Sequence, residues 1–287
     1  MASIGLVYNP RAGAGATEKE LVGACAAQGL EVEACALSRQ INAQFFDLRG
    51  WTTVIAAGGD GTIRAVANEL IGSERTLGVI PAGTLNHFAK DAGIPTDISE
   101  AIAIIVAGHS KRVDTASVNG QGFLNNSSLG LYPSLVRHRD DLAGQIGKWP
   151  AALFGLAKSV AQRRTYRLQV SIDGQVAEFV TPFVFVGNNS YGIDQLGISN
   201  RQSLAGGKLC MYVVKSTSIL ELAKLSCKAL IGNIDQEPSF ESHEGSDLVI
   251  TALRRELAVA LDGEVIELAP PLYYEIKPLS LSVIVPR

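Results

Sequence analysis

The sequence lacks the features that mark several specialised classes of protein. It contains no basic tract of the kind that marks a nucleic-acid binder, and its formal net charge of -3 is close to neutral. No apolar run reaches the length of a membrane span. The first residues, Met1 to Gly5, carry no basic region ahead of an apolar core, so we expect no signal peptide. We therefore expect a cytoplasmic protein without a nucleic-acid partner, in which any membrane contact is peripheral at the inner surface.

Cysteine is also scarce. The four cysteines, Cys25, Cys35, Cys210 and Cys227, lack the paired spacing of a metal site, and we interpret them as reduced core thiols. No internal repeat and no low-complexity tract is found. With 287 residues, of which 47% are hydrophobic and 18% charged, the chain is long enough for one large or two ordinary domains with a substantial core.

A glycine-rich stretch after an apolar run is the first positive signal. The run Val54–Ala57 predicts a buried strand, the stretch Gly58-Gly59-Asp60-Gly61-Thr62 follows it, and Ile63–Leu70 has helix-forming composition. Such a turn lets a polyphosphate approach the backbone, because no Cβ intrudes and the amides of the helix start point outward. The Asp60 carboxylate is consistent with a magnesium ion, or water held by one, beside the phosphates. The alternative is a tight turn that needs glycine for its dihedral angles.

Strands and helices alternate through the first part of the chain. The pattern predicts strands at Ile4–Tyr8, Leu30–Ala36, Thr52–Ala57 and Thr76–Ile80, and helices near Thr17, at Asn42–Leu48, at Ile63–Leu70, from Leu85 and at Ile98–Ala107. This alternation indicates a parallel sheet covered on both faces. Ligands of such sheets bind beyond the carboxyl ends of the strands. We therefore expect the loops at Asn9, Gly58 and Pro81 to lie at one edge.

The pattern changes after Val113, where short strands replace the alternation. Ser117–Gly120 and Phe123–Asn125 look like a hairpin, and the later strands are predicted at Tyr166–Ile172, Gln175–Phe179, Phe183–Val186, Leu209–Val214, Leu248–Thr251, Leu257–Leu261 and Leu281–Val285. Turn dipeptides such as Asp173-Gly174 separate some of them. This is typical of an antiparallel sandwich or barrel-like domain. We place the boundary near residue 116, with a nucleotide-binding domain at 1–116 and a β-rich substrate domain at 117–287.

A stretch between the hairpin and Tyr166 mixes basic and apolar residues. Leu131–Gln162 is expected to be largely helical, with Arg137, Lys148 and Lys158 among leucines, Trp149 and other apolar residues. It could lean on an anionic bilayer surface. It could equally be the solvated rim of helices that cover a core.

Four motifs, taken together, resemble one family. They are Asn9-Pro10-Arg11-Ala12-Gly13, Gly58-Gly59-Asp60-Gly61-Thr62, Pro81–Ala89 and Leu261-Asp262-Gly263-Glu264. Their order and rough spacing resemble the diacylglycerol kinase catalytic-domain family, which includes bacterial lipid kinases and the sphingosine and ceramide kinases. The resemblance covers nearly the whole chain. It implies a Rossmann-like α/β nucleotide-binding domain followed by a β-sandwich-like domain, with ATP and the lipid head group meeting in the cleft between them.

The resemblance also implies site residues. Those expected to contact the nucleotide are Asn9, Pro10, Arg11, Ala12, Gly13, Ser38, Gly58, Gly59, Asp60, Gly61, Thr62, Ile63, Arg64, Ala65 and Thr84. Asp60 is also the candidate ligand of Mg²⁺, the ion expected beside ATP. Asp262 and Glu264 look like the family's catalytic acidic pair, with Glu264 as the base and Asp262 holding Glu264 or the metal. On local grounds alone, Asp262-Gly263 is also the commonest hairpin turn.

Two departures from the family pattern bear on activity. Relatives usually have Asn-Asp-Phe where this chain has Asn86-His87-Phe88, and His87 is a candidate hydrogen-bond partner of Asp114. Relatives with a structural magnesium site carry an acidic Asp-Asp-Gly-x-x-Asp segment, and this chain has Ala205-Gly206-Gly207-Lys208-Leu209-Cys210. Because Mg²⁺ takes oxygen ligands, we expect that auxiliary site to be absent.

Three functions remain open from the sequence. The first is an ATP- and magnesium-dependent lipid kinase, whose lipid the sequence does not name. The second is a soluble-substrate kinase of the NAD kinase or phosphofructokinase type, because these share Gly-Gly-Asp-Gly; the Pro81–Ala89 motif favours the lipid kinases. The third is a nucleotide- or lipid-binding protein without turnover, which the retention of Asp262 and Glu264 disfavours. The oligomeric state is left open.

Overall fold

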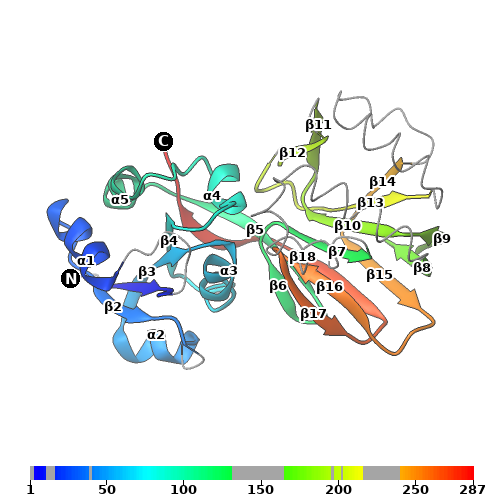
Figure 1. Ribbon diagram of the computed structural model, residues 1–287, viewed down its shortest axis with the longest axis horizontal. Coiled ribbons are helices and arrows are strands. Elements are labelled where there is room, and N and C mark those ends of the chain that lie inside the picture. Colours follow the sequence, from blue (N-terminus) through cyan, green and yellow to red (C-terminus); the bar gives the residue numbers. More distant parts are fainter. Residues whose placement is uncertain are drawn as a thin grey trace, which may run out of the picture. The chain divides into compact units, whose positions relative to one another are not determined.

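Strands and helices alternate along the first part of the computed structural model, as the sequence predicts (Figure 1). The structure describes residues 3–10, 17–38, 41–130, 165–194, 197–201, 203–215 and 240–287. It divides into two units, Met1–Thr115 with Lys277–Arg287, and Ala116–Ile276. The first unit contains β1 (Ser3–Tyr8), α1 (Glu18–Ala27), β2 (Glu33–Ala36), α2 (Ala43–Arg49), β3 (Trp51–Gly58), α3 (Asp60–Asn68), β4 (Thr76–Pro81), α4 (His87–Asp91) and α5 (Ile98–Ala107).

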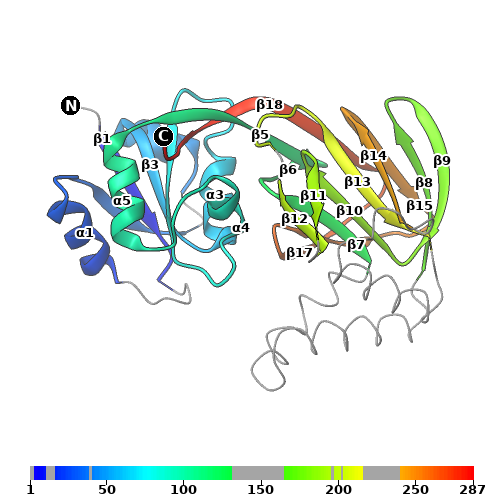
Figure 2. The same cartoon turned by 90° about the horizontal axis from the view of Figure 1, so that it is seen from above.

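The sheet of the first unit is parallel and covered on both faces. Its strands have the order β2-β1-β3-β4, followed by the end of β18 (Leu272–Ile284). Helices α1 and α5 lie side by side and pack Leu21, Cys25 and Ile102 on one face (Figure 2). Helices α2 and α3 lie on the other side (Figure 1). The apolar run of β3 is therefore buried on both faces, as expected for a central parallel strand.

The helix ends follow the capping signals in the sequence. Thr17 and Glu20 form the predicted capping box at α1, with the Thr17 N–H donating to Glu20 Oε2 at 2.8 Å. Asn42 caps α2 by accepting the Phe45 N–H at 2.9 Å. Gly50 ends α2 and Gly108 ends α5 in the left-handed conformation that glycine favours. The predicted helices over Asn42–Leu48 and Ile98–Ala107 are thus confirmed.

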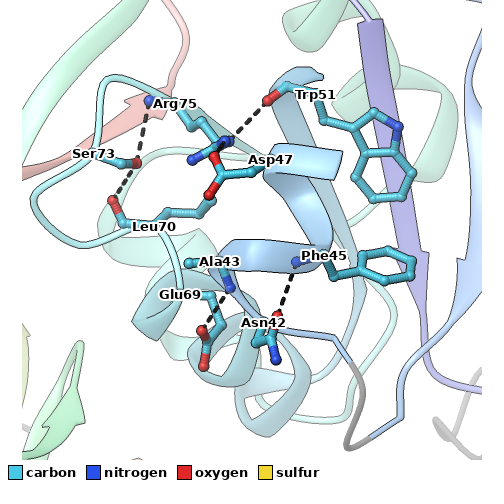
Figure 3. A network of polar contacts seen from close by, with 9 residues as sticks. All are labelled: Asn42, Ala43, Phe45, Asp47, Trp51, Glu69, Leu70, Ser73 and Arg75. Carbon is cyan, nitrogen blue, oxygen red and sulfur yellow. Dashed lines mark hydrogen bonds and ion pairs between the residues drawn. The ribbon is translucent and has the colours of Figure 1, made fainter. Parts of the chain in front are cut away.

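A polar network fixes α2 against its neighbours (Figure 3). The Arg75 guanidinium donates to the Trp51 carbonyl oxygen at 2.9 Å and pairs with the Asp47 carboxylate. At the other end of α2, Glu69 Oε2 accepts the Ala43 N–H at 3.0 Å. Because the first amides of a helix have no partner within the helix, this carboxylate caps α2 together with Asn42. The helix is therefore held at both ends.

The second unit is a sandwich of antiparallel sheets. The connecting strand β5 (Ser110–Val118) leads into β6 (Gln121–Phe123), β7 (Asn126–Gly130), β8 (Tyr166–Ile172), β9 (Gln175–Thr181), β10 (Phe183–Asn188), β11 (Tyr191–Asp194), β12 (Gly197–Arg201), β13 (Leu209–Val214), β14 (Phe240–Gly245), β15 (Asp247–Ala252), β16 (Leu257–Leu261) and β17 (Glu264–Leu268). One sheet has the order β14-β13-β10-β7-β16-β17. The other contains the beginning of β18, then β15, β8 and β9, and β11 pairs with β12 separately.

The sandwich core lies between these two sheets. Val184, Val186 and Leu261 from one sheet pack with Leu168, Val170 and Tyr274 from the other. A hydrogen bond of 3.0 Å joins the Ser127 and Tyr274 hydroxyls across the core. Burial raises the pKa of the Tyr274 phenol. The predicted α/β domain followed by a β-sandwich-like domain is confirmed.

Several details differ from the sequence expectations, and three of them concern the loops or the division into units. The helix expected from Leu85 begins at His87, because Asn86 takes a left-handed conformation with φ 50°. The strand expected at Leu281–Val285 is the end of the longer β18, where Ser282 and Val283 pair with Thr76 and Leu77 of β4. Residues 277–287 therefore belong to the first unit, although the sequence division assigned them to 117–287. An apolar terminal strand does not reveal which sheet it joins.

Some expectations fall outside the described residues. The basic and apolar stretch Leu131–Gln162 and Cys227 are among them. The described cysteines, Cys25, Cys35 and Cys210, are free thiols. Within the described ranges, no helix has both the length and the apolar character needed to cross a bilayer.

Candidate nucleotide site and acidic turn

The register of the parallel strands aligns the predicted nucleotide loops. Tyr8 on β1 is level with Ala36 on β2 and with Ala57 on β3, and Ala57 is level with Ile80 on β4. The ladder continues one step further, since the Leu37 N–H donates to Tyr8 O at 2.7 Å and the Asn9 N–H to Ala57 O at 3.2 Å. Asn9 and Ser38 thus lie just beyond the ends of β1 and β2, and Gly58 and Pro81 are the last residues of β3 and β4, at the same edge. The expectation that the loops share an edge is confirmed.

Two of these loops touch backbone to backbone. A Cβ added to Gly83 would lie 2.5 Å from the Gly59 Cα, and one added to Gly59 would lie 3.3 Å from the Gly83 Cα. Asn86 holds this arrangement, because its side chain accepts the Gly83 N–H at 3.0 Å and donates to the Gly83 carbonyl at 2.9 Å. Position 83 therefore requires glycine, because a Cβ there would collide with the backbone of Gly59.

The start of α3 has the properties of an anion site. Gly59 is its N-cap and provides no side-chain hydrogen bond, and the first helical bond runs from the Ile63 N–H to Gly59 O at 3.0 Å. The amides of the first turn carry the positive end of the helix dipole. A Cβ at Gly58 would lie 2.5 Å from Thr62 Oγ1, so Thr62 packs directly on the glycine. The residues present therefore fit a phosphate group at this helix start.

Asn9 links the first loop to α3. Its side-chain amide donates to Thr62 Oγ1 at 3.2 Å, and Thr62 is buried. Because the Asn9 backbone is also tied to Ala57, the loop leaves β1 in a fixed direction. This places Asn9, the first residue of the predicted motif, beside the start of α3.

Asp60 has a structural partner. Its Oδ1 accepts the Phe88 N–H at 3.2 Å, which caps the short helix α4. His87, the neighbour that departs from the family pattern, is exposed, and Asp114 is buried and accepts the Leu279 N–H at 2.8 Å. The Asp60 carboxylate thus ties the glycine loop to α4.

The other predicted nucleotide residues are placed as follows. Ser38 and Thr84 are exposed, Pro10 is exposed beside Asn9, and Gly61, Arg64 and Ala65 are half-buried on α3, while Ile63 is in the core. Arg11, Ala12 and Gly13 lie outside the described residues.

Asp262 and Gly263 form a hairpin turn between β16 and β17. Both have positive φ angles, 47° and 90°, as in a type I′ turn. The Asp262 carboxylate accepts three backbone N–H groups, from Leu124 at 2.8 Å, Asn125 at 2.8 Å and Asn126 at 3.0 Å. Glu264 begins β17 opposite Leu261, and it is exposed. The side chain of Asp262 therefore organises the backbone around the turn, and Glu264 stands at the exposed start of β17.

A second turn in the same unit has nearly the same design. Asp173 and Gly174 have φ angles of 46° and 83°, and Asp173 Oδ1 accepts the N–H groups of Ser246 at 2.9 Å and Asp247 at 3.0 Å. These hydrogen bonds lower the pKa of Asp173. Gln175 pairs with Ile172, so it occupies the position that Glu264 has in the other turn. The chain thus contains a matched turn in which glutamine replaces the candidate base.

The segment Ala205–Cys210 is held by protein groups. The Lys208 N–H donates to Asn189 Oδ1 at 3.2 Å, and Lys208 Nζ pairs with Glu244 Oε2 at 3.3 Å. The Ser190 hydroxyl donates to Glu244 at 2.6 Å and, with Lys208, lowers the pKa of Glu244. The residues of this segment supply no carboxylate of their own, so they do not fit a hard metal ion. In the part of the chain that the structure describes, no group of three or more His, Cys, Asp or Glu side chains gathers as a ligand set.

Sequence reasoning missed the polar residues that support these loops. Asn86 in the first unit, and Asn125, Asn188 and Arg201 in the second, are buried. Asn86 lies inside a recognised motif, which was a usable signal. The others carry no local signal, because their partners are distant in the sequence.

Comparisons with known proteins agree with this architecture. A family model described as the diacylglycerol kinase catalytic domain matches residues 3–118, and one described as the YegS C-terminal NAD kinase beta sandwich-like domain matches residues 145–285. A protein named diacylglycerol kinase from Staphylococcus aureus (strain bovine RF122 / ET3-1) is 27% identical over 271 residues, 90% of this chain and 85% of its own length. The same figures hold for its namesake from strain Newman.

Solved structures show the same similarity. A proposed diacylglycerol kinase from Bacillus anthracis str. Sterne is 28% identical, with a TM-score of 0.78 over 99% of this chain and 95% of that chain. A second structure of such a protein from that strain has a TM-score of 0.76 at 28% identity, over 99% of this chain and 97% of its own. The fold is thus shared over almost the full length of both chains.

Proposed function

The chain belongs to the diacylglycerol kinase catalytic-domain family, and from this premise we propose that it is an ATP- and magnesium-dependent lipid kinase. Its acceptor is the hydroxyl group of a diacylglycerol-like or related lipid. The relatives named as diacylglycerol kinases support this acceptor class. The proposal assigns nucleotide binding to the first unit and proton acceptance to the acidic turn of the second.

The observation that carries the proposal is the shared edge of the parallel sheet. Four predicted nucleotide segments follow aligned strand ends, and one of them is the uncapped start of α3 beside the contact between Gly59 and Gly83. Closely approaching backbone and outward amides bind phosphates without a side chain in the way. Asn9 and Thr62 fix the geometry of the loops around it.

Phosphoryl transfer needs alignment and charge compensation more than covalent help. ATP would supply the γ-phosphoryl group, and magnesium bound with it would offset the charge of the phosphates. Asp60 would face this ion with the carboxylate oxygen that does not accept the Phe88 N–H. Asn9, Gly61 and Thr62 would hold the phosphates through amides and side chains, and the exposed Ser38 and Thr84 would contact the rest of the nucleotide.

Glu264 is the proposed general base. An exposed carboxylate can take the proton of an incoming lipid hydroxyl, whereas the Asp262 carboxylate already accepts three amides. Asp262 therefore holds the turn, and Glu264 receives the proton. This division of labour follows from the hydrogen bonds of Asp262 and from the exposure of Glu264.

The test is transfer of labelled γ-phosphate from ATP into a mixed lipid extract in the presence of magnesium, with NAD as the acceptor in a parallel reaction. Label in a lipid supports the proposal and begins to identify the substrate. Label in NAD alone would move the protein to the soluble-substrate kinases, which the name of the second matching model makes a pertinent control. Bound ATP with no labelled product would indicate a binding protein.

A further inference from the structure

We propose that Arg201 is a positioning residue for the turn that carries Glu264, and that it acts through the peptide group between Leu124 and Asn125. The role of Glu264 in this inference rests on the proposed function. The coupling between Arg201 and the turn does not, because it is defined by hydrogen bonds within the second unit. No sequence motif marks Arg201.

The segment Leu124–Asn126 is anchored on its amide side by a single carboxylate. All three of its N–H groups donate to Asp262, at 2.8, 2.8 and 3.0 Å. The Asp262 N–H returns a bond of 2.9 Å to Asn126 O. The segment and the turn are therefore one rigid piece of backbone, and a shift of either moves the other.

The carbonyl side of the same segment is anchored by Arg201 and its neighbours. Arg201 Nη1 donates to Leu124 O at 2.6 Å, and Arg201 Nη2 donates to Asn125 Oδ1 at 3.1 Å. Asn188 Nδ2 donates to Leu124 O at 2.8 Å, and the Tyr191 hydroxyl donates to Asn125 O at 3.1 Å. Every carbonyl of the segment thus accepts a described hydrogen bond.

One peptide group lies between two opposite charges. The carbonyl of Leu124 and the N–H of Asn125 belong to the same peptide unit; the first accepts from the Arg201 guanidinium and the second donates to the Asp262 carboxylate. Hydrogen bonds in a chain polarise one another, and bonds to charged groups are the stronger ones. The positive charge therefore strengthens the bond that holds Asp262, and this fixes the start of β17, where Glu264 stands.

The environment of Arg201 favours a specific role. The side chain is only 8% exposed, so its charge has been taken largely out of water. Its planar guanidinium donates to Leu124 O, to Asn125 Oδ1 and, at 3.4 Å, to Asn188 O, an arrangement that a lysine ammonium cannot match in geometry. Losing a hydrogen bond to a charged group corresponds to about a 10- to 150-fold change in an equilibrium or rate constant.

The first test separates turnover from nucleotide binding. Arg201→Gln is expected to lower kcat for lipid phosphorylation about 10- to 100-fold and to leave KM for ATP within about twofold of the wild-type value. Arg201→Lys should recover only part of that loss, because lysine keeps the positive charge but lacks the planar guanidinium that reaches several acceptors. Asp173→Asn, in the matched turn that carries Gln175, is the control and should keep wild-type kcat. An Arg201→Gln enzyme with wild-type kcat would overturn the proposal.

The second test needs no activity. The free energy of unfolding is measured for Arg201→Gln, Asp262→Asn and the double variant, and again with Asp173→Asn in place of Asp262→Asn. Coupling through the shared peptide predicts that the first pair is non-additive and the second additive. Additive losses for Arg201 and Asp262 would refute the coupling, even if the protein phosphorylates lipids. Should no wild-type activity be found, this cycle still decides the coupling, and only the proposed function fails.

Discussion

Removing the charge of Asp262 is the most informative perturbation of the second unit. In Asp262→Asn one carboxylate oxygen becomes an NH₂ group, so one of the three amides of Leu124–Asn126 loses its acceptor and the other two bonds lose their charge. A bond to a charged acceptor contributes about 1.5–3 kcal/mol and a neutral one about 1 kcal/mol. With the lower of these values, about 1.5 kcal/mol for the lost bond and about 0.5 kcal/mol for each weakened bond, the free energy of local opening should fall by about 2.5 kcal/mol.

Amide hydrogen exchange measures this opening directly. A loss of that size predicts exchange about 30- to 150-fold faster at residues 124–126. Asp173→Asn is the matched control: it should speed exchange at Ser246 and Asp247 and leave residues 124–126 unchanged. Exchange rates at residues 124–126 within about threefold of wild type in Asp262→Asn would refute the idea that the Asp262 carboxylate holds these amides, because the loss of bonds of this strength cannot leave their protection intact.

The remaining predictions concern the first unit and the contacts of Glu244 with Ser190 and Lys208 in the second unit. Gly83→Ala, whose Cβ would meet the Gly59 backbone, should lower the free energy of unfolding by about 1–3 kcal/mol and weaken ATP binding. Gly23→Ala, in the middle of α1 with open space around it, should raise the free energy of unfolding by about 0.5–1 kcal/mol. Thermal unfolding with ATP titration checks both. Because its pKa is lowered in the folded state, Glu244 stabilises the fold at pH values above the usual glutamate range, and this contribution is lost as the pH falls through the lowered pKa. Ser190→Ala should therefore reduce the loss of stability between neutral and acid pH, which unfolding measured over that pH range checks. Asp60→Ala should shift the magnesium dependence of nucleotide use; kinetics that stay the same across a magnesium titration would leave Asp60 only its bond to Phe88.

The spacing of apolar residues predicted the strands and helices whose buried positions repeat with the period of the element. The helix Ile98–Ala107 and the strands Leu209–Val214 and Leu257–Leu261 occur with the predicted bounds, because apolar spacing and capping residues act locally. The edge at which the nucleotide loops meet also followed from the sequence, since parallel strands place their carboxyl ends together. Both predictions depend on residues that are close together in the sequence.

Long-range partners could not be predicted in the same way. The hydrogen bonds of Arg201 reach back to Leu124, and the end of β18 pairs with β4 from the other end of the chain. The predicted helix begins at His87 and not at Leu85, because the left-handed backbone of Asn86 lets its side chain bond to Gly83. Such features depend on tertiary contacts, which local pattern does not encode.

The acidic turn shows why a local pattern alone is ambiguous. Asp262-Gly263 was open to two interpretations, a hairpin turn or part of a catalytic pair, and the structure contains the turn. The turn at Asp173 has the same backbone and the same kind of clamp, with Gln175 in place of Glu264. A hairpin is therefore compatible with either role, and the side chain that follows the turn is what distinguishes them.

The most direct measurement of the central claim is turnover by Glu264→Gln. Glutamine already stands at the equivalent position of the matched turn, so the substitution is structurally mild. Labelled phosphate from ATP is followed into lipid for the wild type and the variant, and ATP affinity is measured for both. The account predicts that the labelled lipid disappears while ATP affinity stays within about twofold. Near-normal turnover in Glu264→Gln would contradict it.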